Sequence, residues 1–87
     1  MRDVYGVAAF RSRQQVLRFE AAHRQRGVPT QVVTTPRDIS MGCGLSVRFP
    51  MERLGEVRRT VLAANPGNLI GLYRAEYDGT RLRVGPV

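Results

Sequence analysis

The sequence predicts an α+β domain in which two helices cover one face of a mostly antiparallel sheet. Short apolar or alternating segments, typical of strands, are interleaved with two segments whose apolar residues recur at helical spacing. The order strand, helix, strand occurs twice in succession, and a loop at residues 36–44 joins the two halves. This is the βαββαβ pattern of ferredoxin-like sandwiches, to which a C-terminal hairpin adds one strand.

The first half of the chain supplies a strand and a helix. Val4 to Phe10 is an uncharged apolar run, which we expect to be a buried strand. Ser12 is the candidate N-cap of the following helix, and Gln15 would complete a capping box. We expect this helix to end near Arg26, because Gly27 is typical of the position after a helix C-terminus.

The remaining elements follow from periodicity and turn residues. Leu54, Val57, Val61 and Ala64 form one apolar stripe on the second helix. Asp78-Gly79 indicates a two-residue hairpin turn. We expect strands at 31–34, 45–49, 70–77 and 80–84, and the second helix at 51–64.

Length and composition limit the function classes. The 87 residues contain no linker, so we expect one domain over residues 1–87. One cysteine and one histidine give neither an intramolecular disulfide nor the four ligands of a zinc site. We see no signal-peptide pattern, no apolar run of about 18 residues, no P-loop and no dinucleotide fingerprint. We therefore expect a cytoplasmic protein with no membrane segment, metal or cofactor.

The chain is basic, with a net charge of +7 that comes from 14 arginines and no lysine. Such a surface attracts nucleic acids, acidic proteins and small anions. The arginines are scattered, which favours a solvated surface. In a ferredoxin-like RNA-binding domain, aromatic residues of the central strands stack on bases. Here only Tyr5 fits that role, because Ser46 and Arg48 occupy the outward positions of the third strand, so we disfavour nucleic acid as a partner.

The loop at 36–44 is the strongest candidate site. It contains the single cysteine, Cys43, between Gly42 and Gly44. Glycines allow backbone N–H groups to approach an anion closely, and nearby cations favour the reactive thiolate. Arg37 in the loop and Arg48 on the following strand could supply this charge. The alternative is an unreactive cysteine in a glycine-rich turn.

His23 is a second candidate for chemistry. It falls on the apolar face of the first helix with Val16 and Phe19. We favour a half-buried histidine with satisfied hydrogen bonds over a catalytic base. A Cys–His pair would require the two side chains to lie within hydrogen-bond reach.

The segment from Pro36 to Phe49 also resembles a known family. Pro36-Arg37, Ile39-Ser40 and Cys43-Gly44, followed by an alternating strand that ends in Arg48-Phe49, are similar to the selenium/sulfur (Se/S) carrier protein-like domains of bacteria. Supporting similarities outside this segment are Phe10-x-Ser12, Glu20, Gly27-Val28-Pro29 and Gly71-x-Tyr73.

The resemblance implies a carrier rather than a stand-alone enzyme. Cys43 would hold sulfur or selenium, as a persulfide or selenosulfide, between a donor protein and an acceptor protein. Arg37, Arg48, Ser40, Gly42 and Gly44 would support the bound anion. The alternative is a non-catalytic interaction module that docks or forms homo-oligomers through the open sheet face, with RNA binding as a less favoured third reading.

Overall fold

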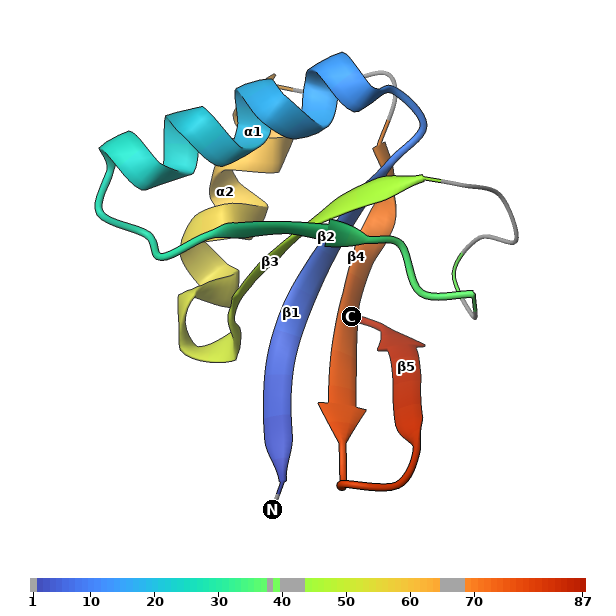
Figure 1. Cartoon of the computed structure of the whole chain (residues 1–87). Coiled ribbons are helices and arrows are strands. Elements are labelled where there is room, and N and C mark those ends of the chain that lie inside the picture. The colour runs from blue at the N-terminus through green and yellow to red at the C-terminus, as the bar shows by residue number, and fades with distance from the viewer. Residues whose placement is uncertain (1, 38, 40–43, 65–68) are drawn as a thin grey trace.

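A computed structural model describes residues 2–37, 39, 44–64 and 69–87, apart from the side chain of Ala64. The structure is α+β and, in these residues, contains two α-helices, one short 3₁₀-helix and five strands (Figure 1). In chain order the elements are β1 (Asp3–Phe10), α1 (Arg13–Gln25), β2 (Gln31–Thr34), β3 (Leu45–Pro50), η1 (Met51–Arg53), α2 (Leu54–Ala64), β4 (Leu69–Tyr77) and β5 (Leu82–Pro86).

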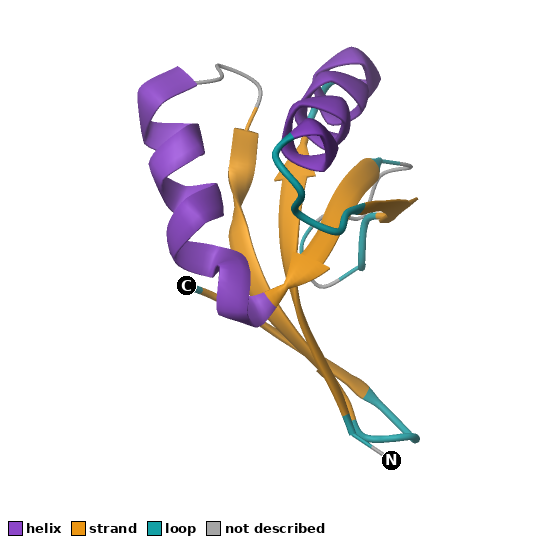
Figure 2. Cartoon of the chain, turned by 90° about the vertical axis from the view of Figure 1, so that its left-hand side faces the viewer, coloured by secondary structure: helices purple, strands orange, loops and turns teal. Residues whose placement is uncertain are grey.

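The strands form one antiparallel sheet in the order β2-β3-β1-β4-β5. The strand β1 lies at the centre, where Ala8 pairs with Val47 of β3 on one side and with Leu72 of β4 on the other. Both α-helices lie on the same side of this twisted sheet (Figure 2). The predicted α+β class and antiparallel sheet are confirmed, and the ferredoxin-like assignment of the first four strands stays a prediction.

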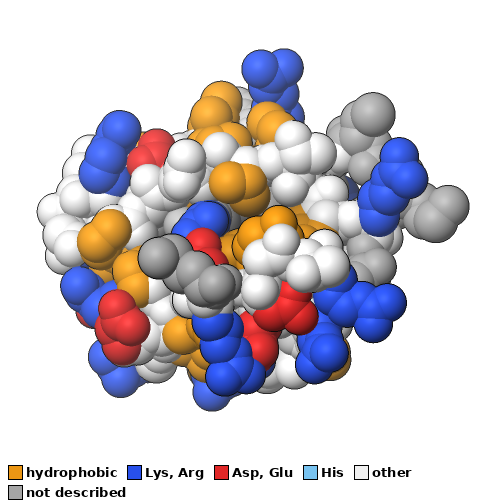
Figure 3. All heavy atoms as spheres, turned by 60° about the horizontal axis from the view of Figure 1, so that its bottom comes forward, with side chains coloured by type: hydrophobic (Ala, Val, Ile, Leu, Met, Phe, Trp, Pro, Cys, Tyr) orange, Lys and Arg blue, Asp and Glu red, His pale blue; other side chains and the backbone are white. Residues whose placement is uncertain are grey.

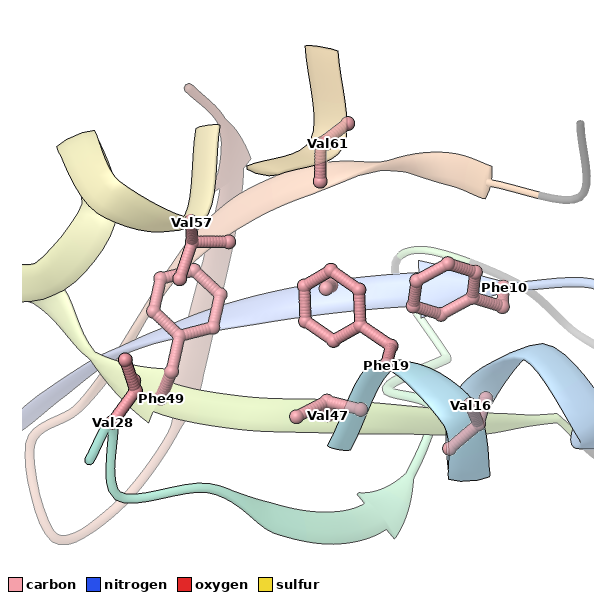
Figure 4. Close-up of a cluster of buried hydrophobic side chains, with 9 residues drawn as sticks. Phe10, Val16, Phe19, Val28, Val47, Phe49, Val57 and Val61 are labelled. Carbon is pink, nitrogen blue, oxygen red and sulfur yellow. The ribbon is translucent and has the colours of Figure 1, made fainter. Parts of the chain in front are cut away.

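The hydrophobic core lies between the sheet and the two helices (Figure 4). The predicted stripe of α2 contributes Val57 and Val61, and α1 contributes Val16 and Phe19. The buried members from the strands and from the α1–β2 connection are Ala8, Phe10, Val28, Val47 and Phe49. The alternation of β3 therefore works as predicted, with Val47 and Phe49 directed toward the helices.

Gly6 is a point of close approach in this core. It is paired with Phe49 across β1 and β3, and a Cβ placed on Gly6 would overlap the Phe49 ring. The ring itself is fully buried. Glycine is therefore required here to make room for an aromatic side chain.

The far face of the sheet is less open than the sequence suggested. Strand alternation directs Val7, Ala9 and Ala75 away from the helices, yet each is 0% exposed. The residues paired with Val7 on the same face are Arg48 and Tyr73, and both are half-buried. Large side chains at these pleat positions cover their small neighbours, so the centre of this face already has a cover.

The two ends of α1 agree with the sequence to different degrees. At the C-terminus, Gly27 has φ +82°, and the N–H groups of Gly27 and Val28 donate to the carbonyls of Arg24 and His23. This is the predicted glycine stop, in the Schellman arrangement. At the N-terminus, Ser12 occupies the N-cap with an extended backbone, but its side chain makes no capping hydrogen bond. The predicted capping box with Gln15 is therefore wrong.

Two further boundaries differ from the prediction. The second helix begins with a 3₁₀ turn, Met51–Arg53, before its α-helical part, as helix N-termini often do. The β4–β5 hairpin has a four-residue loop, because Tyr77 pairs with Leu82. The carboxylate of Asp78 accepts the N–H groups of Thr80 and Arg81 at 2.8 and 2.9 Å, and this local turn delays the return strand by two residues.

Charged side chains are distributed over the surface in both signs. Figure 3 shows arginines spread over one face with acidic groups among them, not gathered in one patch. In the part of the chain that the structure describes, the ion pairs are Arg2–Glu76, Arg24–Glu20, Arg48–Asp3, Arg53–Glu56 and Arg74–Glu76. None of the described helices is long and apolar enough to cross a membrane.

We expect the Glu76 carboxylate to make a pH-dependent contribution to the folding stability of the domain. Hydrogen bonds from Arg2 (2.7 Å) and Arg74 (3.0 Å) hold the pKa of Glu76 below its ordinary value. Its stabilising contribution is therefore complete above the unfolded-state pKa and is lost as pH falls through the lower folded-state pKa. We expect Glu76→Gln to lower the urea midpoint at neutral pH, and the difference from wild type to shrink at acid pH. Glu52→Gln, at an exposed position, is the control, and a pH-independent difference for Glu76→Gln would contradict the assignment.

Candidate functional site

The loop that carries Cys43 joins two neighbouring antiparallel strands. Thr34 of β2 pairs with Leu45 of β3, and the Thr35 N–H donates to the Gly44 carbonyl at 2.9 Å. The loop is therefore closed at its base by strand pairing. Cys43 and two of its predicted supporting residues, Ser40 and Gly42, lie outside the described residues.

A buried pair of hydroxyl groups braces the base of the loop. The oxygens of Thr35 and Ser46 lie 2.6 Å apart, and the two residues are 4% and 0% exposed. A buried hydroxyl requires a partner, and here each satisfies the other. This contact links the residue after β2 to the second residue of β3, so it positions both chain segments that enter the loop.

The presence of glycine at position 44 is explained by the limited space for a side chain and not by a left-handed backbone. The described glycines with positive φ are Gly27 and Gly79, so Gly44 does not require that conformation. A Cβ on Gly44 would lie 3.1 Å from Oγ1 of Thr35, closer than most side chains tolerate. The residue next to the cysteine is thus held directly against the hydroxyl brace.

Arg37 lies in a turn at the start of the loop. The Ile39 N–H donates to the Pro36 carbonyl at 3.0 Å and closes this turn. Arg37 is exposed, and Ile39 is half-buried. The described part of the loop therefore combines an anchoring apolar side chain with a cation that faces solvent.

A groove beside Gly44 is lined by two arginines at the start of α1 that were not among the predicted site residues. Its volume is about 460 Å³, and Arg11, Arg13, Thr34, Gly44 and Leu45 line it. Arg11 and Arg13 are both exposed. The groove therefore joins the end of the candidate loop to a positively charged wall.

The strand register explains why these arginines meet the loop. Ala9 near the end of β1 pairs with Ser46 near the start of β3. A Cβ on Gly44 would lie 3.9 Å from the Phe10 carbonyl oxygen, so the chain leaving β1 passes the residue next to Cys43. This proximity of Arg11 and Arg13 to Gly44 follows from the antiparallel pairing of β1 with β3, which the sequence pattern did not show.

Arg48, in contrast, is engaged away from the base of the loop. Its Nη2 lies 2.6 Å from Oδ2 of Asp3, and its guanidinium carbon lies 3.8 Å from the centre of the Tyr5 ring. Asp3 is at the end of β1 opposite to Phe10. The structure therefore does not bring the Arg48 charge together with Gly44, and it covers one face of the ring that base stacking would need.

His23 is more deeply placed than the sequence suggested. It is 0% exposed, its ring packs on Phe19 with centroids 4.0 Å apart, and its Nδ1 lies 2.9 Å from the Phe19 carbonyl oxygen. The described contacts give no support to a Cys–His pair, because the hydrogen bond of the His23 ring is to a carbonyl of its own helix.

The comparisons with known proteins yield one finding. A family model described as "Putative Se/S carrier protein-like" matches residues 5–74, which include the loop and both α-helices. No curated protein and no solved structure matches the chain.

The hydroxyl brace can be tested by substitution. Ser46→Ala should leave the buried Thr35 hydroxyl without its partner, which typically costs about 1–3 kcal/mol of unfolding free energy. We also expect faster hydrogen exchange of the Thr35 amide, which bonds to Gly44. The double variant Thr35→Val/Ser46→Ala should recover part of the loss, because neither polar group is then stranded. A double variant at least as unstable as the sum of the single variants would contradict this role.

Proposed function

We propose a function from one premise, namely that the chain belongs to the Se/S carrier protein-like family. In this proposal the domain is a sulfur or selenium carrier, and Cys43 is the atom of attachment. The chain takes the group from a donor protein and delivers it to an acceptor protein. The single observation that supports this most directly is the arginine-lined groove at Gly44, the residue that follows Cys43.

The transfer step is a thiolate exchange. The Cys43 thiolate attacks the outer sulfur of a protonated persulfide on the donor. A new S–S bond forms at Cys43, the S–S bond of the donor persulfide breaks, and the donor cysteine leaves as a thiolate. The outer sulfur keeps its proton and its oxidation level as it moves to Cys43. The step therefore needs no oxidant or reductant. With selenium, the same displacement gives a selenosulfide on Cys43.

Positive charge near the loop favours both the attacking thiolate and the persulfide that the step forms. Thiolates and persulfide anions are stabilised by nearby cations. Arg11 and Arg13 line the groove at Gly44, and Arg37 is exposed in the loop itself. We therefore assign the supporting charge to these three arginines. The predicted support from Arg48 has no described contact in its favour, because Asp3 and Tyr5 engage that side chain.

The construction of the loop also fits a carrier. A carrier must present its thiol to two different partners, so the thiol should lie on an accessible connection held by a firm base. Strand pairing and the Thr35–Ser46 hydroxyl pair provide such a base. The partially covered far face of the sheet gives less support to the alternative, docking through that face, because its small apolar residues are already buried.

The first test asks whether Cys43 accepts sulfur. The intact chain is incubated with a cysteine desulfurase and cysteine, and its intact mass is measured. We expect a mass increase of one sulfur atom that disappears after treatment with a thiol reductant. Cys43→Ser is the control and should show no adduct. An unmodified wild type, or an equal adduct on Cys43→Ser, would refute the carrier proposal.

The second test concerns the groove arginines. We expect Arg11→Gln/Arg13→Gln to slow alkylation of Cys43 at neutral pH by about two- to fivefold, because two exposed charges are removed from the thiolate's surroundings. The comparison protein is Arg81→Gln/Arg83→Gln, which removes the same charge at exposed positions near the β4–β5 loop. Raised salt should reduce the difference. Equal alkylation rates in the two double variants would show that the groove does not activate the thiol.

A further inference from the structure

The groove beside Gly44 is larger than activation of a single thiol requires. It is bordered by the chain that leaves β1, the start of α1, the end of β2 and the start of β3, which lie at the same end of the sheet (Figure 1). Its volume of about 460 Å³ falls within the range of roughly 300–1,000 Å³ that is typical of sites for whole organic ligands. A small inorganic anion would leave most of this open groove to water, whereas a few residues of polypeptide would fill it.

Two guanidinium groups border this groove at a regular spacing. Arg11 and Arg13 both line it, and both are exposed. Ser12 between them has an extended backbone, with φ −109° and ψ 125°. Side chains on either side of an extended residue point to the same face, roughly 6–7 Å apart. The groove therefore presents two cations at the spacing that alternate residues have in a strand.

The other lining residues are uncharged. Thr34 and Leu45 are paired at the ends of β2 and β3, and Thr34 offers a hydroxyl while Leu45 offers an apolar side chain. No aromatic side chain is among the described lining residues, so the groove lacks the stacking surface that single-stranded nucleic acid uses. Cations beside a hydroxyl and a leucine favour an acidic polypeptide over RNA as the occupant.

We propose that this groove docks an extended acidic segment of a partner protein. Two carboxylates at alternate positions of the segment pair with Arg11 and Arg13, because successive residues of the same face in an extended chain have the spacing of these two side chains. A guanidinium group binds a carboxylate through two parallel hydrogen bonds, which fixes the orientation of the segment. An apolar residue beside the carboxylates packs on Leu45.

The identity of this partner as the sulfur or selenium donor or acceptor rests on the proposed function. Gly44 lines the groove and directly follows Cys43 in the chain, so a docked segment lies beside the residue next to the thiol. Docking itself does not require the thiol. Cys43→Ser should bind the acidic segment as wild type does while it accepts no sulfur, so failure of the carrier proposal and failure of the docking proposal are distinguishable.

The experiment uses two matched peptides as probes. One is a fluorescein-labelled hexapeptide of alternating glutamate and leucine, and the other has glutamine in place of each glutamate. Fluorescence anisotropy at low salt should show saturable binding of the acidic peptide, at least about fivefold tighter than the glutamine peptide and weaker as salt is raised. In ¹⁵N spectra of the protein, the amides of Thr34, Gly44 and Leu45 should shift. Equal affinities for the two peptides, or binding without shifts at these amides, would overturn the proposal.

Two double variants test the location of binding. Arg11→Gln/Arg13→Gln should weaken binding of the acidic peptide at least about threefold, because it removes both cations of the groove. Arg58→Gln/Arg59→Gln removes the same charge at exposed positions of α2 that do not line the groove, and should weaken binding less than about twofold. Circular dichroism and urea midpoints check that both variants fold. Equal losses in the two folded variants would show that net charge, and not the groove, attracts the peptide.

Two further probes separate the acidic segment from other anions. A labelled uridine RNA hexamer should bind more weakly than the acidic peptide. Tighter binding of the RNA, lost in Arg11→Gln/Arg13→Gln, would assign the groove to nucleic acid and overturn the proposal. Inorganic phosphate at the concentration of the peptide should not displace it. Complete displacement would show that the groove takes a small anion instead of a polypeptide segment.

Discussion

The pairing of the central strand β1 with β3 and β4 is the constraint on which the rest of the structure depends. Val7, Ala8 and Ala9 are completely buried, with the helices against one face and half-buried side chains of β3 and β4 on the other. The small residues let large neighbours approach, as Phe49 does over Gly6. A strand covered on both faces has little freedom to change register, because a slip of one residue would exchange its two faces.

This register also assembles the candidate site. The antiparallel alignment brings the chain that leaves β1, with Arg11 and Arg13, to the start of β3, where Gly44 precedes the strand. Arg48, by contrast, is paired with Asp3. In the described part of the chain, neither Arg11 nor Arg13 belongs to such an ion pair. Positive charge beside the loop is therefore not neutralised locally by a described carboxylate.

The helix layer has a different chemistry from the loop. The groove between α1 and α2 is mostly apolar, and His23 in its wall is 0% exposed, whereas the groove at Gly44 is bordered by exposed guanidinium groups. The groove at Gly44 therefore suits an anion. Because α1 contributes to both, with Arg13 at one end and His23 near the other, one helix borders an apolar groove and a cationic one.

The sequence by itself determined the α+β class, the order of elements and the position of the loop, because periodicity and turn residues are local signals. The alternation of Leu45 to Phe49 and the stop at Gly27 are examples that the structure confirms. Local patterns gave wrong predictions where a side chain made an unexpected hydrogen bond or lacked the expected one. Asp78 bound two backbone N–H groups and lengthened a hairpin, and Ser12 made no side-chain capping bond. The proximity of Arg11 and Arg13 to Gly44, the Arg48–Asp3 pair and the unsatisfied Nε2 of His23 were decided by tertiary structure alone. Each of these features joins segments that are distant in sequence or depends on how those segments pack. The spacing of residues along the chain does not predict such contacts.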